Sequence, residues 1–190
     1  MYTIEGSVTN TTITKKSKFI AFLQPVFSSS KANELIKQLK NQYKDATHVC
    51  YAYIINENEF KYYDDGEPQN TAGLPIYKSL CNKNLSHIIC VVVRYFGGIK
   101  LGANGLVHAY SDSALSAIEE SKIIPYRELS SYIIEISYSD FDTLNHYLNK
   151  NEIAITDKQF LDNILVSFNA GDEEIKEIKE LFPNITVTKN

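Results

Sequence analysis

The chain has 190 residues, of which 44% are hydrophobic and 12% aromatic, so it can bury one large core or two small ones. No apolar run approaches the ~18 residues of a membrane span, and the N-terminal residues lack the basic-then-apolar order of a signal peptide. We therefore expect a cytoplasmic protein without a membrane partner. Its three cysteines are an odd number with no CxxC pair, which indicates reduced thiols and excludes a zinc site built from cysteine pairs.

The net charge of −4 is distributed unevenly. Residues 1–125 carry 13 Lys and Arg against 11 Asp and Glu, a balance of +2, whereas residues 126–190 carry 6 against 12, a balance of −6. An acidic protein is not a sequence-blind nucleic-acid binder, so only the first part offers a surface suited to phosphate. The charge reverses at the Pro-containing stretch 122–126, which predicts a linker between two domains, 1–125 and 126–190.

The first elements expected are two strands, 2–9 and 11–26, around a polar turn at Asn10–Thr12. A helix over 31–43 follows, with N-cap candidates at Ser28–Ser30 and an apolar stripe at helical spacing. Three lysines of the second strand form either a solvated strand edge or a basic contact surface: Lys15, Lys16 and Lys18.

A strand is expected over residues 47–55, and its alternation sends His48 and Cys50 to the same face. A Cys–His nucleophile is chemically conceivable there, because an imidazole can hold a neighbouring thiolate. However, Cys50 shares that face with Ala52 and Ile54, which favours a place in the core. His48, at the start of the strand, is the more open of the two to a functional role.

Three carboxylates follow within four positions, in a turn built on Gly66 and Pro68: Asp64, Asp65 and Glu67. Like charges so close repel one another unless a hard cation, a basic partner or backbone N–H donors hold them. The spacing is not that of an EF-hand. The alternatives are a ligand-binding turn and an exposed acidic turn before a helix that begins near Thr71 and runs to Leu80.

The centre of the chain is an unbroken apolar run, residues 88–93, which is typical of a strand buried on both faces. A glycine-rich turn and an apolar helical stripe from Leu106 to Ile118 come next. Glycines that free backbone N–H groups, followed by a helix N-terminus, form a natural anion site, but a tight strand-to-helix connection has the same pattern. The turn contains Gly97, Gly98, Lys100, Gly102 and Gly105.

Residues 126–190 show a regular β-α-β-β-α-β pattern, which is the ferredoxin-like order. The expected strands cover 132–138, 153–158, 164–169 and 185–188, with one helix capped by Asp140 and one starting at Gly171–Asp172. This part contains no cysteine, a single histidine and no clustered glycine, so we interpret it as a binding or docking module.

Four motifs occur in a fixed order: Ser17–Ala21, Ala46–Tyr53, Asp64–Gly73 and Arg94–Gly102. Together they resemble the YigZ/IMPACT family. The resemblance implies an α+β fold, with an N-terminal domain like the second domain of a small-subunit ribosomal protein and a ferredoxin-like C-terminal domain. The same two folds occur consecutively at the C-terminal end of elongation factor G. Eukaryotic members of the family restrain a starvation-sensing kinase that controls translation initiation, whereas bacterial members have no settled biochemical function.

The chain departs from the family pattern at four positions. Asn70, Asn104 and Ser111 stand where the family usually has glycine, and Asn is the non-glycine residue that adopts positive φ most readily. His108 stands where Lys or Arg is expected. In the first turn of a helix the dipole pushes an imidazole toward neutrality, which weakens the case for a phosphate contact there.

Two hypotheses follow. In the first, the protein is a translation-associated regulatory module that contacts RNA or the ribosome through residues 1–125, with the three lysines, Arg94 and Lys100 as contacts, and meets a protein through its acidic second domain. In the second, it is a small metal-assisted hydrolase of phosphoesters or peptides, in which the three carboxylates of the acidic turn hold a divalent cation and the glycine-rich turn holds a phosphate. Only this alternative requires a cofactor. The sequence leaves the partner, catalysis and the oligomeric state open. The candidate binding residues are His48, Asp64, Asp65, Glu67, Arg94, Gly97, Gly98, Lys100, Gly102, Asn104 and His108.

Overall fold

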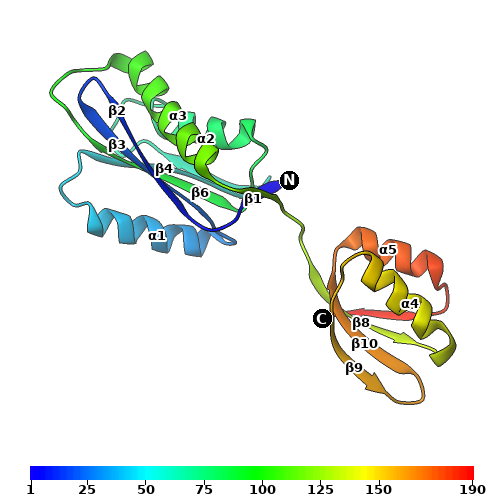
Figure 1. Ribbon diagram of the computed structural model, residues 1–190. Coiled ribbons are helices and arrows are strands. Elements are labelled where there is room, and N and C mark those ends of the chain that lie inside the picture. The colour runs from blue at the N-terminus through cyan, green and yellow to red at the C-terminus, as the bar shows by residue number, and fades with distance from the viewer. The chain divides into compact units, whose positions relative to one another are not determined.

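The computed structural model describes all 190 residues, which form a mixed α/β protein with five helices and three sheets. The chain divides into two compact units, Met1–Tyr126 and Arg127–Asn190 (Figure 1). None of the five helices combines the length and the apolar character needed to cross a lipid bilayer.

The first unit is built on a five-stranded sheet in which every neighbouring pair is antiparallel. The strands lie in the order β2 (Val8–Thr14), β3 (Ser17–Pro25), β6 (Ile88–Tyr95), β4 (His48–Asn56) and β5 (Glu59–Tyr63). The apolar run of the sequence forms β6, the central strand, which is buried at every position except its last, Tyr95. The prediction of a strand buried on both faces is confirmed.

Helices cover both faces of this sheet, as Figure 1 shows. Helix α1 (Ser29–Gln42) packs on the face that carries Val49, and Ser28 caps it as the sequence predicted. Helices α2 (Gly73–Asn82) and α3 (Gly102–Glu120) pack on the face that carries Cys50. The alternation predicted for the strand after residue 47 is therefore confirmed, and Cys50 lies in the core.

The hairpin between β2 and β3 differs from the expectation. The residues Asn10–Thr12 lie inside β2, and the chain reverses at Lys15 and Lys16, which have φ angles of 45° and 66°. Two-residue hairpin loops favour positive φ at both positions because that twist matches the strands, and Asn-Gly is the usual choice. The turn was not predicted from the sequence, because lysine adopts positive φ only with strain and is not a typical turn residue at these two positions.

The structure of residues 122–126 also differs from the predicted linker. Its residues Ile123–Pro125 form β7, which pairs antiparallel with β1 (Tyr2–Ile4) in a two-stranded sheet. This stretch belongs to the first unit, and the two units separate between Tyr126 and Arg127. A pairing between strands about 120 residues apart leaves no local trace in the sequence.

The second unit has the expected β-α-β-β-α-β element order, and its four-stranded sheet runs β11-β8-β10-β9. Ser137, rather than Asp140, caps α4, and its hydroxyl accepts the Asp140 N–H. Tyr132, Ile134 and Ile136 of β8 face the helices, so the alternate positions face away from them. The elements are β8 (Ser130–Ile136), α4 (Tyr138–Lys150), β9 (Ile155–Phe160), β10 (Ile164–Ala170), α5 (Asp172–Leu181) and β11 (Thr186–Lys189).

Candidate functional site

The first carboxylate of the acidic turn, Asp64, caps helix α2 from outside the helix. One carboxylate oxygen accepts the N–H groups of Ala72 and Gly73 at 3.0 and 2.9 Å, and the other accepts the Asn70 N–H at 2.9 Å. No side chain at the helix start itself makes a cap. A negative group at a helix N-terminus satisfies free donors and interacts favourably with the dipole. Asp64 is therefore engaged in holding α2 in place.

The second carboxylate, Asp65, ties the turn to β4 and α1. Its side chain accepts the Val49 N–H at 2.7 Å and the Lys40 ammonium at 2.6 Å. Its backbone carbonyl lies 2.7 Å from Nδ1 of His48. Because a carbonyl can only accept, Nδ1 carries the proton of the imidazole. The turn thus positions His48 through Nδ1, which leaves Nε2 for another contact.

The third carboxylate, Glu67, is the centre of a buried ion pair. Its Oε1 accepts from Nη1 of Arg94 at 2.5 Å and from the Tyr110 hydroxyl at 2.8 Å, while Oε2 lies 3.8 Å from Nε2 of His48. The side chains of Arg94 and Glu67 are 6% and 4% exposed. Burial raises the pKa of Tyr110 far above its usual range, so the phenol stays protonated and donates.

These contacts bear directly on a metal site. Each of the three carboxylates already accepts hydrogen bonds from different protein donors, and no three His, Cys, Asp or Glu side chains lie together in a way that could hold a metal ion. Backbone N–H donors and basic side chains, rather than a cation, offset the repulsion among the three carboxylates. The turn is thus held by the fold itself.

The Cys–His pair is not assembled as a nucleophile. The Cys50 thiol is buried, lies 3.0 Å from the Asp64 carbonyl oxygen and 3.4 Å from the Tyr110 hydroxyl, and forms no hydrogen bond with His48. Burial raises the pKa of Cys50 well above its usual range, and nearby carboxylates add to the effect. The thiol is consequently protonated at neutral pH, as expected for a core residue.

The glycines of the central turn have different local reasons. A Cβ at Gly97 would lie 2.0 Å from the carbonyl of Lys16, so this glycine lets the turn pack directly on the β2–β3 hairpin. Gly98 and Gly102 have φ angles of 83° and 75°, which L-residues rarely adopt. Gly97 is therefore a packing glycine, and the other two shape the turn.

The positions that depart from the family pattern behave differently from one another. Asn70 has a φ of 62°, so it does replace glycine in a left-handed conformation. Asn104 lies within α3 and is not among the residues with positive φ. His108 is exposed in the second turn of α3, where the helix dipole acts weakly, so the prediction that it lies in the first turn is wrong.

A cleft of about 320 Å³ joins the acidic turn to the glycine-rich turn. Of the eleven predicted residues, five line it, whereas Asp64, Asp65, Gly97, Gly98, Asn104 and His108 do not. The sequence did not single out Phe96, Thr47 or the hydroxyl of Tyr110 as site features. The hydroxyl of Tyr110 could have been anticipated, because a tyrosine at a buried helical position usually forms a buried hydrogen bond. The predicted residues lining the cleft are His48, Glu67, Arg94, Lys100 and Gly102.

Lysines of the glycine-rich turn and of the β2–β3 hairpin have no carboxylate partners, and one of them, Lys100, lines the cleft. Gly97 packs on the Lys16 backbone, and Lys18 pairs with Tyr95 in the sheet, so the hairpin borders the loop that carries Lys100. All four side chains are exposed, and none forms an ion pair. We call this set the basic edge: Lys15, Lys16, Lys18 and Lys100.

Comparison with known proteins identifies the family. A family model described as the Impact N-terminal domain matches residues 15–118, which is more than half of the chain. The chain belongs to the IMPACT family. The resemblance inferred from the four motifs is thereby confirmed.

Relatives in the IMPACT family extend over both units. The family member YvyE of Bacillus subtilis is 30% identical over 191 residues, covering 100% of this chain and 88% of the relative. YigZ of Escherichia coli is 29% identical over 150 residues, covering 77% of this chain and 74% of the relative. A crystal structure of a hypothetical protein aligns at 25% identity and a TM-score of 0.68, covering 98% of this chain and 95% of that one.

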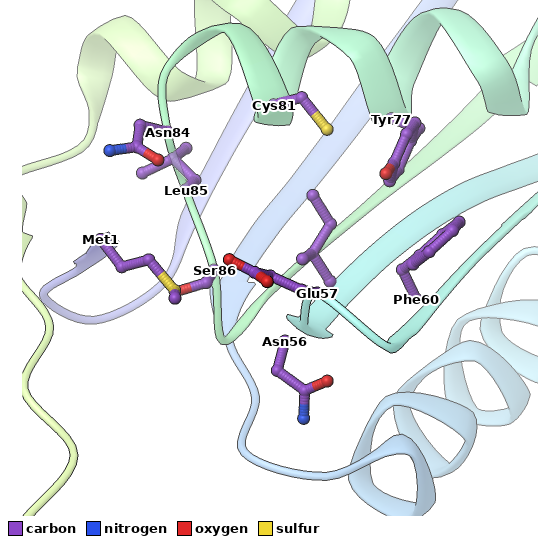
Figure 2. Close-up of a pocket in the computed structure, with 10 residues that line it drawn as sticks. Met1, Asn56, Glu57, Phe60, Tyr77, Cys81, Asn84, Leu85 and Ser86 are labelled. Atoms are coloured by element: carbon purple, nitrogen blue, oxygen red, sulfur yellow. The ribbon is translucent and has the colours of Figure 1, made fainter.

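A second cleft of this IMPACT family member, about 210 Å³ in volume, contains none of the predicted site residues. Figure 2 shows the rings of Phe60 and Tyr77 next to each other in its wall, with Cys81 on the same helix as Tyr77. Glu57 is the one charged side chain among the lining residues. This cleft therefore has no cationic side chain for an anionic ligand, in contrast to the cleft beside the basic edge.

Proposed function

We propose that this IMPACT family member is a translation-associated regulatory protein whose first unit contacts the phosphate backbone of RNA, free or in the ribosome, through the basic edge. Its acidic second unit meets a protein partner. Membership of the family supports the link to translation. The proposal includes the finer folds that the family implies: a first unit like the second domain of a small-subunit ribosomal protein, and a ferredoxin-like second unit.

The observation that carries the proposal is the unpaired state of the basic edge. Lys100 and the hairpin lysines come from two parts of the chain whose backbones pack together at Gly97, and none of them pairs with a carboxylate, whereas the buried Arg94 is neutralised by Glu67. Clustered cations that the protein does not neutralise attract polyanions, and each phosphate contact releases counterions. Arg94 then supports the site rather than contacting phosphate.

The second unit is unsuited to RNA, which supports a protein partner for it. Its charge is −6, from 6 Lys and Arg against 12 Asp and Glu. The sheet face that the helices leave open lacks aromatic side chains on which bases could stack. That face carries Ser131, Ile133, Glu135, Asp157, Gln159, Leu165, Ser167, Asn169, Thr186 and Thr188.

The test is RNA binding by the full chain at several salt concentrations. The double variant Lys18→Ala/Lys100→Ala should bind all RNA sequences more weakly to a similar degree. It should also lower the slope of log affinity against log salt by roughly 0.7 to 0.9 per lost contact. The control Lys176→Ala/Lys179→Ala removes two exposed lysines of the second unit and should leave both quantities unchanged. Equal effects of the two variants, or no RNA binding by the parent, would contradict the proposal.

A further inference from the structure

The cleft between the acidic and glycine-rich turns has apolar walls. Pro68, Leu101, Ala103 and Leu106 line it together with the ring of Phe96, which is 46% exposed. The Phe96 N–H donates to the Thr47 hydroxyl at 2.9 Å, which fixes the backbone that carries the ring. An exposed aromatic ring on a fixed backbone, beside apolar walls, is a stacking surface for a planar group.

The rim of the same cleft suits a negative charge. Lys100 and the first residues of α3 line it, and no side chain caps the N-terminus of this 19-residue helix. The first N–H groups of a helix have no partner within the helix, and the dipole there favours an anion. A cation and a helix start thus lie next to an apolar wall.

Buried Arg94 supplies a second and independent sign of a ligand. Arg94 lines the cleft and is bonded to Glu67 through Nη1, yet its Nε is buried without any hydrogen-bond partner. A buried unsatisfied donor costs free energy, so native proteins rarely leave one. An occupant with acceptor atoms at its edge therefore suits a cleft lined by this arginine better than a purely apolar occupant does.

We propose that this cleft receives one unstacked nucleotide of single-stranded RNA, with the base against Phe96 and its phosphate near Lys100 and the start of α3. The inference rests on the proposed function and specifies the form of RNA. The cleft volume lies at the lower end of the range for ligand pockets, which suits one nucleotide. Bases of a duplex remain stacked on one another and cannot enter, so the cleft selects single strands.

The experiment compares single-stranded and duplex RNA of equal length in binding to the full chain. The parent should prefer the single strand. Phe96→Ala should weaken single-strand binding by roughly 5- to 150-fold, the range of one base–aromatic stack, and leave duplex binding unchanged. Phe60→Ala is the matched control, because Phe60 is 45% exposed and lies outside this cleft. Ala103→Tyr, which fills the cleft and removes no group, should reproduce the loss caused by Phe96→Ala.

The outcomes separate the two proposals. Equal binding of both RNA forms, with Phe96→Ala and Phe60→Ala indistinguishable, would overturn the nucleotide site and leave the basic edge as a contact for the backbone. Loss of duplex and single-strand binding to the same degree in Phe96→Ala would also overturn it. Absence of binding to either form in the parent would remove the proposed function as well.

Discussion

The acidic turn and the basic edge are both charge clusters in the first unit, yet the structure uses them in opposite ways. The carboxylates of Asp64, Asp65 and Glu67 each accept hydrogen bonds from the protein, from backbone N–H groups, Lys40, Arg94 and Tyr110. The lysines of the basic edge have no carboxylate partner. The acidic charges therefore maintain the fold, whereas the charges of the basic edge are not neutralised within the protein.

This difference teaches how to read clustered charges in a sequence. Carboxylates that follow a strand and precede a helix can cap that helix, as Asp64 does for α2. Lysines at a hairpin tip have few backbone groups to satisfy and extend into solvent. The sign of a cluster says less about its role than the donors and acceptors that surround it.

The comparison predicts its largest effect for the buried ion pair. Glu67→Ala should destabilise the protein by about 3–5 kcal/mol, because it leaves the Arg94 guanidinium buried without its counter-charge. Urea denaturation measures this change. Glu57→Ala, at an exposed position, should change stability by less than ~0.5 kcal/mol. A small effect of Glu67→Ala would mean that the turn is not held by the fold, which would break the comparison.

A smaller effect is expected for the helix cap. Asp64→Asn removes the negative charge and one of the two acceptor oxygens, so we expect a loss of about 1–2 kcal/mol. The loss should be concentrated at the start of α2, where hydrogen exchange of the Ala72 and Gly73 amides should accelerate. Unchanged exchange at these two amides would show that Asp64 is free for another role.

The cysteines provide the mildest test, because labelling leaves the sequence intact. Exposed Cys81 should react first with a thiol reagent in the native protein. Burial raises the pKa of Cys90 to about 12 and that of Cys50 further, so few thiolates form at neutral pH and both should react slowly. Labelling of Cys50 as fast as Cys81 would show that the acidic turn opens, and would restore the Cys–His nucleophile as a hypothesis.

Much of the sheet was predictable because its signals are local. The apolar run of β6 and the alternation from His48 onward depend only on neighbouring residues, and both have the expected burial. The start of α1 at Ser28 was visible for the same reason. Burial and side-chain period are properties that a single strand or helix carries by itself.

The site was less predictable because its contacts join distant residues. Tyr110 lies within the apolar stripe predicted from Leu106 to Ile118, but its bond to Glu67 spans 43 residues and the Arg94–Glu67 pair spans 27. The sequence predicts Gly97 as part of a possible anion loop, whereas its main constraint is the Lys16 backbone in the β2–β3 hairpin. Such contacts cannot be predicted from side-chain periodicity, because they form only when the elements pack against one another.

The central claim is that the basic edge is kept for a partner at a cost in stability, and one variant tests it directly. Lys15→Asn/Lys16→Gly retains the two-residue loop and its positive φ angles. It relieves the strain that lysine has at these angles, and it removes two charges. Thermal unfolding should show a gain of roughly 1–3 kcal/mol. Single-stranded RNA binding should weaken, with a salt slope smaller by about 1.4. A more stable variant that binds RNA as tightly as the parent would contradict the claim.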